Sequence, residues 1–195
     1  MRSKRLLDVV VGSVMLLLAT PILAGVALAM RLTGDRGPLL YRAPRVGERG
    51  RVFTILKVRT MVPDLPGSAI TVAADRRITP LGRLLRRTRI DELPQLLNVL
   101  RGEMSLVGPR PEDPRLVDWT DPLHRRVFTA RPGITGLAQL SFYDEATQLT
   151  GPDPEQRYRE TILPAKLALD LEYLDHRSMR LDLEILARTL ATVLR

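Results

Sequence analysis

The sequence predicts a mainly α-helical fold with a small β-hairpin element, placed after an apolar N-terminal segment that associates with a membrane. Three observations predict this class. Residues 9–30 carry no charge. Leucines recur at helical spacing from residue 78 to 101, and two further apolar runs follow between 155 and 195. Residues 52–60, VFTILKVRT, partly alternate between apolar and polar side chains after a Gly–Arg turn signal, which is typical of a hairpin.

The uncharged N-terminal segment is long enough to reach across the hydrocarbon core of a bilayer. A straight helix over residues 9–30 reaches about 33 Å, close to the thickness of the hydrocarbon core. A cleaved signal peptide would have a shorter apolar region and a small-residue cleavage site after it. The segment AMRLTGDRG follows instead, so we interpret residues 9–30 as a membrane segment.

Its topology rests on two features. Thr20 and Pro21 lie near the middle, where proline removes a backbone donor and kinks a helix. Basic residues flank both ends, and such residues mark the cytoplasmic side. A helix that enters the membrane, bends at Thr20–Pro21 and returns satisfies both features, whereas a kinked spanning helix satisfies only the first. From these residues alone both topologies stay open.

Composition narrows the classes of function. The 195 residues carry a net charge of +8, with three lysines and 27 arginines. This balance suits nucleic acid, an anionic membrane face or phosphorylated substrates. The low aromatic content of 4% argues against stacking on single-stranded nucleic acid. Because cysteine is absent, disulfides, zinc–thiolate sites and thiol catalysis are excluded, and two histidines (His124 and His176) argue against a multi-histidine metal site.

Two helices are expected in the middle of the chain. In ITPLGRLLRRTRI, residues 78–90, leucines and arginines occupy different faces, which is typical of a helix on an anionic membrane or of a solvated helix. In DELPQLLNVLRG, Pro94 fits only the first turn, so the second helix is expected to begin at about Asp91 and to end at Gly102. Residues 63–77, 105–113 and 131–139 are expected to be loops rich in proline and glycine.

The adjacent acids Asp91 and Glu92 have two interpretations. At a helix start they would accept backbone hydrogen bonds and favour the helix dipole, and local physics favours this role. The same position and the nearby arginines would hold Asp91 ionised as a nucleophile, bring a phosphate close, and let the two carboxylates hold Mg²⁺. Lys57 and Arg59 can share one strand face. Arg110 stands between Pro109 and Pro111, which suits preorganised binding of an anionic group.

The order of motifs is more specific than any one of them. The segments KRLLDVVVG, FTILKVRTM, ITPLGRLLRRTRIDELPQLLNVLRGEMSLVGPRPE and RPGITGLAQ together resemble the bacterial sugar transferase family, the monotopic phosphoglycosyl transferases, over nearly the whole chain. The resemblance implies transfer of a sugar 1-phosphate from a UDP-sugar to polyprenol (undecaprenyl) phosphate, through a phosphosugar-aspartyl intermediate and with release of UMP. This step would begin surface glycoconjugate synthesis at the cytoplasmic face of the bacterial inner membrane.

The resemblance also implies roles for single residues. Asp91 would be the nucleophile, and Glu92 would support Mg²⁺ or act on the proton of the acceptor. Lys57, Arg59 and Arg86 would bind substrate phosphates, and the Pro109–Arg110–Pro111 motif would contact the nucleotide. The pair Thr20–Pro21 stands where the family has a Ser–Pro break.

Two regions and a set of partners follow from the same resemblance. Residues 1–31 would form a re-entrant helix-break-helix, and residues 32–195 a compact cytoplasmic catalytic domain with amphipathic interfacial helices. The expected partners are the UDP-sugar, the lipid phosphate and the bilayer, without nucleic acid. A homodimer is compatible with this interpretation.

Overall fold

The computed structural model describes residues 2–34, 37–62, 70–73, 75–150 and 153–193. The protein is mostly helical with two small two-stranded sheets. One of these sheets is the hairpin that the sequence predicts. The longer helices are α1 (Arg2–Leu32), α2 (Pro80–Arg87), α3 (Gln95–Arg101), α8 (Leu163–His176) and α9 (Met179–Val193). Shorter ones are α4 (Pro122–Val127), α5 (Leu137–Ser141), α6 (Glu145–Gln148) and α7 (Pro154–Arg157).

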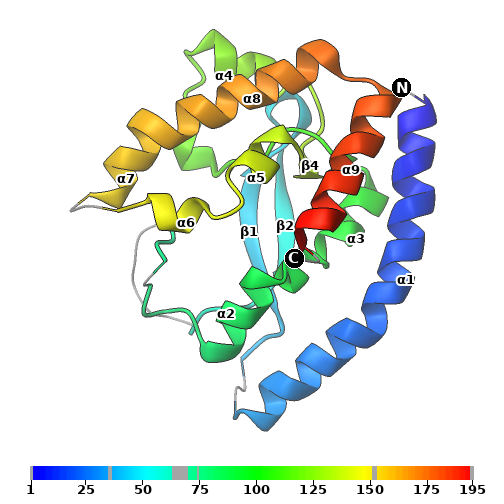
Figure 1. Ribbon diagram of the computed structural model, residues 1–195, viewed down its shortest axis with the longest axis vertical. Helices are drawn as coiled ribbons and strands as arrows, with labels where there is room; N and C mark the ends of the chain where they lie inside the picture. Colours follow the sequence, from blue (N-terminus) through cyan, green and yellow to red (C-terminus); the bar gives the residue numbers. More distant parts are fainter. Residues whose placement is uncertain (1, 35–36, 63–69, 74, 151–152, 194–195) are drawn as a thin grey trace.

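Helix α1 is continuous, and the break expected at Thr20–Pro21 is a bend within it. Figure 1 shows the helix changing direction partway along its length. Pro21 supplies no N–H to the ladder, and the Thr20 hydroxyl donates to the carbonyl of Leu16 at 2.8 Å. Proline and a hydroxyl bonded back into the helix both bend helices.

The apolar surface of α1 is largely uncovered. Residues 3–32 are long and apolar enough to cross a membrane by length and composition. Only 17% of the most apolar stretch is buried, so α1 is not the core helix of a globular domain. Leu17, Leu18 and Leu28 are among its exposed side chains, at 60–74% of full exposure.

The first two turns of α1 are joined to the body by charged side chains. Lys4 Nζ lies 2.6 Å from the Asp182 carboxylate in α9. Asp8 is buried and accepts hydrogen bonds of 2.9 Å from the hydroxyl of Ser105 and from the next backbone N–H. Arg5 donates to two carbonyls at the C-terminal end of α3. These side chains therefore fix α1 to the protein, in addition to any effect of their charge on topology.

The hairpin lies where the sequence predicts it. Strand β1 (Leu40–Val46) pairs antiparallel with β2 (Val52–Val58), and a 3₁₀ turn at Glu48–Gly50 connects them. Of the loop predicted over residues 63–77, positions 63–69 and 74 lie outside the described residues, and the described part contains no helix or strand.

The other two predicted loops are only partly loops. They contain β3 (Ser105–Val107) and β4 (Gly133–Thr135), which pair in parallel. Each strand has three residues, too few to show a periodic pattern, and β3 is buried throughout. The backbones at Gly133 and Gly108 lie close together. A Cβ on Gly133 would lie 2.1 Å from the backbone nitrogen of Gly108, so this position requires glycine.

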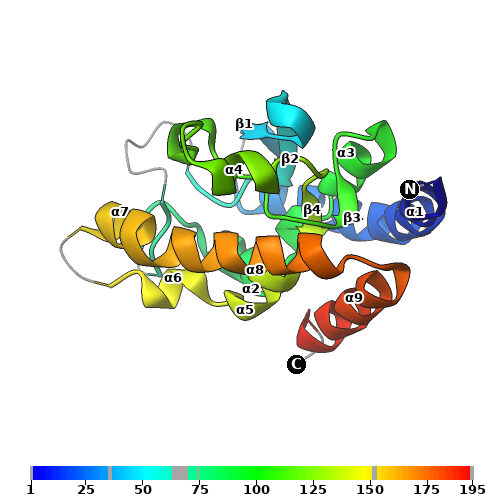
Figure 2. The same cartoon turned by 90° about the horizontal axis from the view of Figure 1, so that it is seen from above.

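One main core joins the elements. It combines buried side chains from β1, β2, α1, α3, β3, α8 and α9, with Val99 and Ile185 fully buried. Figure 2 shows the hairpin and α8 on opposite sides of the short β3–β4 pair. The segment carrying the acidic pair lies between β2 and α3, so this core sets its position.

Candidate active site

The acidic pair lies in a 3₁₀ turn, Ile90–Glu92, and not at the first turn of an α-helix. Helix α3 begins only at Gln95, with Pro94 at its N-cap, so the predicted start at Asp91 is wrong, whereas the predicted Gly102 C-cap is confirmed. Arg89 precedes the turn in the left-handed conformation, with φ 56°. A non-glycine residue there interrupts the helical path between α2 and α3.

Asp91 is not a helix cap. Its side chain is buried, at 6% exposure, and within the described part of the chain its Oδ1 atom has no hydrogen-bond partner. An unpaired buried oxygen costs stability, and such groups are frequent at functional sites. The capping interpretation is therefore wrong for this side chain.

Glu92 is the partner of Lys57. Lys57 Nζ donates a hydrogen bond of 2.7 Å to Glu92 Oε1, and an Arg89 nitrogen lies 3.8 Å from the same oxygen. Burial alone would raise the pKa of Glu92. The positive charges of Lys57, Arg89 and Arg110 outweigh it and lower that pKa to about 2. Glu92 is thus firmly ionised.

At Asp91, in contrast, burial outweighs the effect of the positive charges on the pKa. Burial, followed by the charge of Glu92, raises its pKa to about 6, although Lys57, Arg86 and Arg89 oppose the shift. The basic residues lower the pKa of Asp91, as the sequence analysis expected, but desolvation exceeds their effect. At pH 7 a carboxyl with this pKa is still about nine-tenths ionised.

Arg86 reaches the site because α2 packs directly on the chain after β2. Thr79 caps α2 by accepting from the Gly82 N–H at 2.9 Å. A Cβ on Gly82 would lie 2.1 Å from the carbonyl oxygen of Thr60, so only glycine permits this approach. One turn later, Arg86 Nε donates to the Thr60 hydroxyl at 2.8 Å. Burial lowers the pKa of Arg86 while the charge of Asp91 raises it.

The strand that carries Lys57 is tied to α3 by Asn98. This side chain is fully buried, accepts a hydrogen bond of 3.1 Å from the Leu56 N–H and donates one of 2.8 Å to the carbonyl of Thr54. The Asn98 side-chain amide thus forms with β2 the hydrogen bonds that a neighbouring strand would form. Because α3 follows the acidic pair, Asn98 helps to set the distance between Lys57 and Glu92.

The Pro109–Arg110–Pro111 motif follows β3, and both prolines are buried. The Arg110 N–H donates to Asp170 Oδ2 at 3.3 Å. Burial would lower the pKa of the Arg110 guanidinium, but the carboxylates of Glu145, Glu92 and Glu112 raise it overall. No direct partner of that guanidinium is found among the described residues, so its charge remains available to an anionic ligand.

A buried ion cluster lies behind Arg110. Lys166 is almost completely buried and pairs with Glu145, and it donates to the Tyr158 hydroxyl at 3.1 Å. Tyr158 in turn donates to Glu112 at 2.9 Å. Burial raises the pKa of Asp170, which borders this cluster, to about 8.

Arg59 lies apart from Lys57, although only one residue separates them: Lys57 is in β2, and Arg59 follows directly after this strand. Its Nε donates to the carbonyl of Pro38 at 2.8 Å. It also lines a cavity of about 400 Å³ between the C-terminal end of α1 and the start of α2, with Met30, Thr33, Thr79 and Leu81 among the other lining residues. The structure thus brings together Lys57, Arg86, Asp91 and Glu92, with Arg110 nearby, and places Arg59 in a separate cavity.

Several site residues escaped the sequence analysis, among them Asn98, Glu112, Tyr143, Glu145 and Lys166. One compositional signal bears on them. The three lysines, Lys4, Lys57 and Lys166, each form an ion pair with a carboxylate inside the protein, in a chain that otherwise uses arginine. The scarcity of lysine could therefore have marked these positions.

The acidic pair could contribute to a metal site only together with a ligand. Among the described residues no group of three or more acidic, histidine or cysteine side chains is arranged to hold a metal ion. Mg²⁺ is commonly held by one or two carboxylates together with substrate phosphates and water. The unpaired Oδ1 of Asp91, next to Glu92, fits such a shared site.

Comparisons with known proteins give matches over nearly the whole chain. A family model described as bacterial sugar transferase matches residues 1–195. A UDP-glucose:undecaprenyl-phosphate glucose-1-phosphate transferase of Caulobacter vibrioides is 41% identical over 98% of this chain and 69% of its own length. An undecaprenyl-phosphate glucose phosphotransferase of Komagataeibacter xylinus is 41% identical over 97% of this chain, which spans only 35% of that protein. An exopolysaccharide production protein of Rhizobium leguminosarum is 38% identical over 98% of this chain and 94% of its own length.

Proposed function

The chain belongs to the bacterial sugar transferase family, and from this membership we propose that it transfers a sugar 1-phosphate from a UDP-sugar to undecaprenyl phosphate. Relatives that match nearly the whole chain carry names for this type of transferase. The product, an undecaprenyl diphosphate sugar, would begin a surface glycan, in keeping with the relative named for exopolysaccharide production.

The observation that carries the proposal is the buried, unpaired oxygen of Asp91 beside three cations. Lys57, Arg86 and Arg89 all act on the Asp91 carboxyl through their charge. A diphosphate brings negative charge that these cations would accept, and an unpaired carboxylate oxygen is suited to attack phosphorus. Lys57 holds Glu92 ionised and in place, which leaves Asp91 as the available nucleophile.

We propose two displacement steps. First, an oxygen of the Asp91 carboxylate attacks the sugar-bearing phosphorus. The bond from this phosphorus to the bridging oxygen breaks, and UMP leaves with the electron pair. Then an oxygen of undecaprenyl phosphate attacks the same phosphorus. The aspartyl–phosphorus bond breaks, which restores the Asp91 carboxylate.

Cations around the substrate would serve both steps. Asp91 and Glu92 would hold Mg²⁺ together with substrate oxygens, and the ion would neutralise diphosphate charge. Arg86 and Lys57 would orient the phosphates, and Arg110 would contact the nucleotide. The substrate group that Arg59 would bind, in its separate cavity near α1, is the phosphate of the lipid acceptor.

The membrane arrangement is also a proposal. The exposed apolar surface of α1, its bend at Pro21 and the basic surface of α2 fit a helix that enters and leaves the same face of the bilayer. In this arrangement residues 1–31 anchor a cytoplasmic catalytic domain, residues 32–195, at the inner membrane. A soluble donor and a lipid acceptor can then meet one carboxylate.

A burst experiment tests the reaction. Purified full-length protein is mixed with candidate UDP-sugars and Mg²⁺ without the lipid, and UMP is measured. One UMP per active enzyme is expected, followed by turnover when undecaprenyl phosphate is added. Asp91→Asn should abolish the burst, whereas Asp175→Asn, a change at an exposed surface ion pair, should retain it. An Asp91→Asn variant that still releases UMP would rule out the covalent mechanism.

Topology can be tested separately, because the chain has no cysteine. Single cysteines replace Ser3 or Thr33, which are exposed near the two ends of α1. A membrane-impermeant maleimide is applied to sealed vesicles of known orientation. Labelling of both positions from the cytoplasmic side is expected, and labelling from opposite sides would identify a spanning helix.

A further inference from the structure

Tyr143, in the connection between α5 and α6, contacts the residues just before the acidic pair in three ways. The guanidinium carbon of Arg89 lies 4.5 Å from the centre of the Tyr143 ring. Arg89 also donates a hydrogen bond of 2.6 Å to the backbone carbonyl of Tyr143. The Tyr143 hydroxyl donates to the carbonyl of Arg87 at 3.1 Å. These contacts join segments more than fifty residues apart.

Arg89 is the residue through which Tyr143 can act on the site. Its backbone is left-handed, a strained conformation for a non-glycine residue that persists only where other contacts hold it. Its carbonyl accepts from the Glu92 N–H at 3.1 Å, closing the turn that contains Asp91. Its guanidinium lies 3.8 Å from Glu92 Oε1.

We propose that Tyr143 is a positioning residue for the acidic pair, holding the Arg89 side chain against Glu92 and the Arg89 backbone in the conformation that begins the turn. The inference rests on the proposed function for its catalytic consequence, but the contact itself exists without substrate. The same segment reaches the other side of the site, since Glu145, two residues later, pairs with Lys166 and faces Arg110.

The test compares three full-length variants in the same detergent or nanodisc preparation. Tyr143→Leu removes the ring and the hydroxyl, and we expect kcat to fall about tenfold with KM for the UDP-sugar within about twofold. Tyr143→Phe keeps the ring and the backbone carbonyl, and should restore kcat to within about twofold of the wild type.

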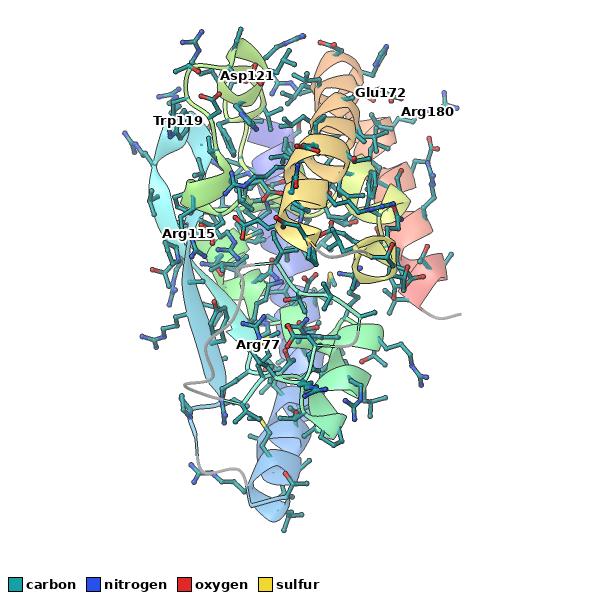
Figure 3. All side chains as sticks on the ribbon, turned by 90° about the vertical axis from the view of Figure 1, so that its left-hand side faces the viewer. Arg77, Arg115, Trp119, Asp121, Glu172 and Arg180 are labelled. Atoms are coloured by element: carbon teal, nitrogen blue, oxygen red, sulfur yellow. The ribbon has the colours of Figure 1, made fainter. Side chains whose placement is uncertain are left out.

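Trp119→Leu is the matched control, an aromatic-to-leucine change outside the site. Trp119 is 44% exposed, packs on Phe128, and lies toward one end of the molecule, away from Arg77 near α2 (Figure 3). It should leave kcat unchanged. An unchanged kcat in Tyr143→Leu, or an equal fall of kcat in Tyr143→Phe, would overturn the proposal.

A measurement without substrate separates this proposal from the proposed function. Nitrogen-15 NMR of arginine-labelled protein follows the Arg89 Nε–H signal in each variant at one fixed pH. Because the Arg89 guanidinium lies on the Tyr143 ring, we expect this signal to move in Tyr143→Leu and to stay near its wild-type position in Tyr143→Phe, whatever reaction the enzyme performs. An unchanged signal in Tyr143→Leu would overturn the proposal. If Tyr143→Leu does not fold, Tyr143→Met removes the same ring, and the same two outcomes decide the proposal.

Discussion

The amine of Lys57 lies 2.7 Å from one carboxylate oxygen of Glu92, and Asp91 receives no such partner among the described residues. Because only Glu92 has this partner, the two neighbouring acids have different pKa values. The pKa of Glu92 is about 2 and that of Asp91 about 6, although Lys57 and Arg89 act on both carboxyls. Pairs of acids with divergent pKa values are frequent where one group must be charged and placed while the other reacts.

The pH dependence of the first step should report Asp91. Because only the ionised carboxylate is a nucleophile, kcat/KM for the UDP-sugar should fall about tenfold per pH unit below pH 6. The profile is measured from pH 4.5 to 8 with pre-incubation controls for stability. A limb near pH 4 would show that Asp91 is not desolvated in the working enzyme.

Glu92→Gln should move that limb to lower pH by about one unit, because the negative charge of Glu92 raises the pKa of Asp91. The variant will also lose activity, since Lys57 is no longer held by a carboxylate. The diagnostic quantity is therefore the limb position and not the rate. An upward shift would contradict the charge balance described for the site.

Asp91 should reduce the stability of the folded protein at neutral pH. Its pKa is raised from the ordinary value of 3.8 to about 6. Its contribution to stability is therefore fully present below pH 4 and is lost as the pH rises through 6. Asp91→Asn should increase the free energy of unfolding by about 1–2 kcal/mol at pH 8 and by little at pH 4. Denaturant titration at both pH values measures this, with Asp175→Asn as the exposed control.

Asn98→Ala should be strongly destabilising. The change removes the partners of the Leu56 N–H and the Thr54 carbonyl in a fully buried place. We expect a loss of about 2–4 kcal/mol and a lower Tm. Gln148→Ala, at an exposed amide in α6, is the matched control. A loss below 1 kcal/mol for Asn98→Ala would show that water replaces the amide at the strand.

The sequence predicted the features that depend on local chemistry. Gly102 was expected to end a helix because glycine readily adopts the left-handed conformation of a C-cap, and the structure confirms it. The hairpin followed from alternation over residues 52–58. Helix α1 followed from its uncharged length, although its continuity through Pro21 did not.

Features that depend on distant partners were not predictable. The β3–β4 pair joins three-residue segments, and the role of Asn98 depends on the unpaired side of β2. The turn at Asp91 requires a left-handed Arg89, which Tyr143 contacts from 54 residues away. Local propensity favoured a helix start at this point because it contains no information about those contacts.

The pair formed by Lys4 and Asp182 joins positions 178 residues apart. During synthesis, α1 leaves the ribosome long before α9 exists, so Lys4 cannot pair with Asp182 until that later helix is made. The partners of Arg5 and Asp8, in α3 and at β3, are made earlier. A helix made late in synthesis therefore completes the attachment of the helix made first.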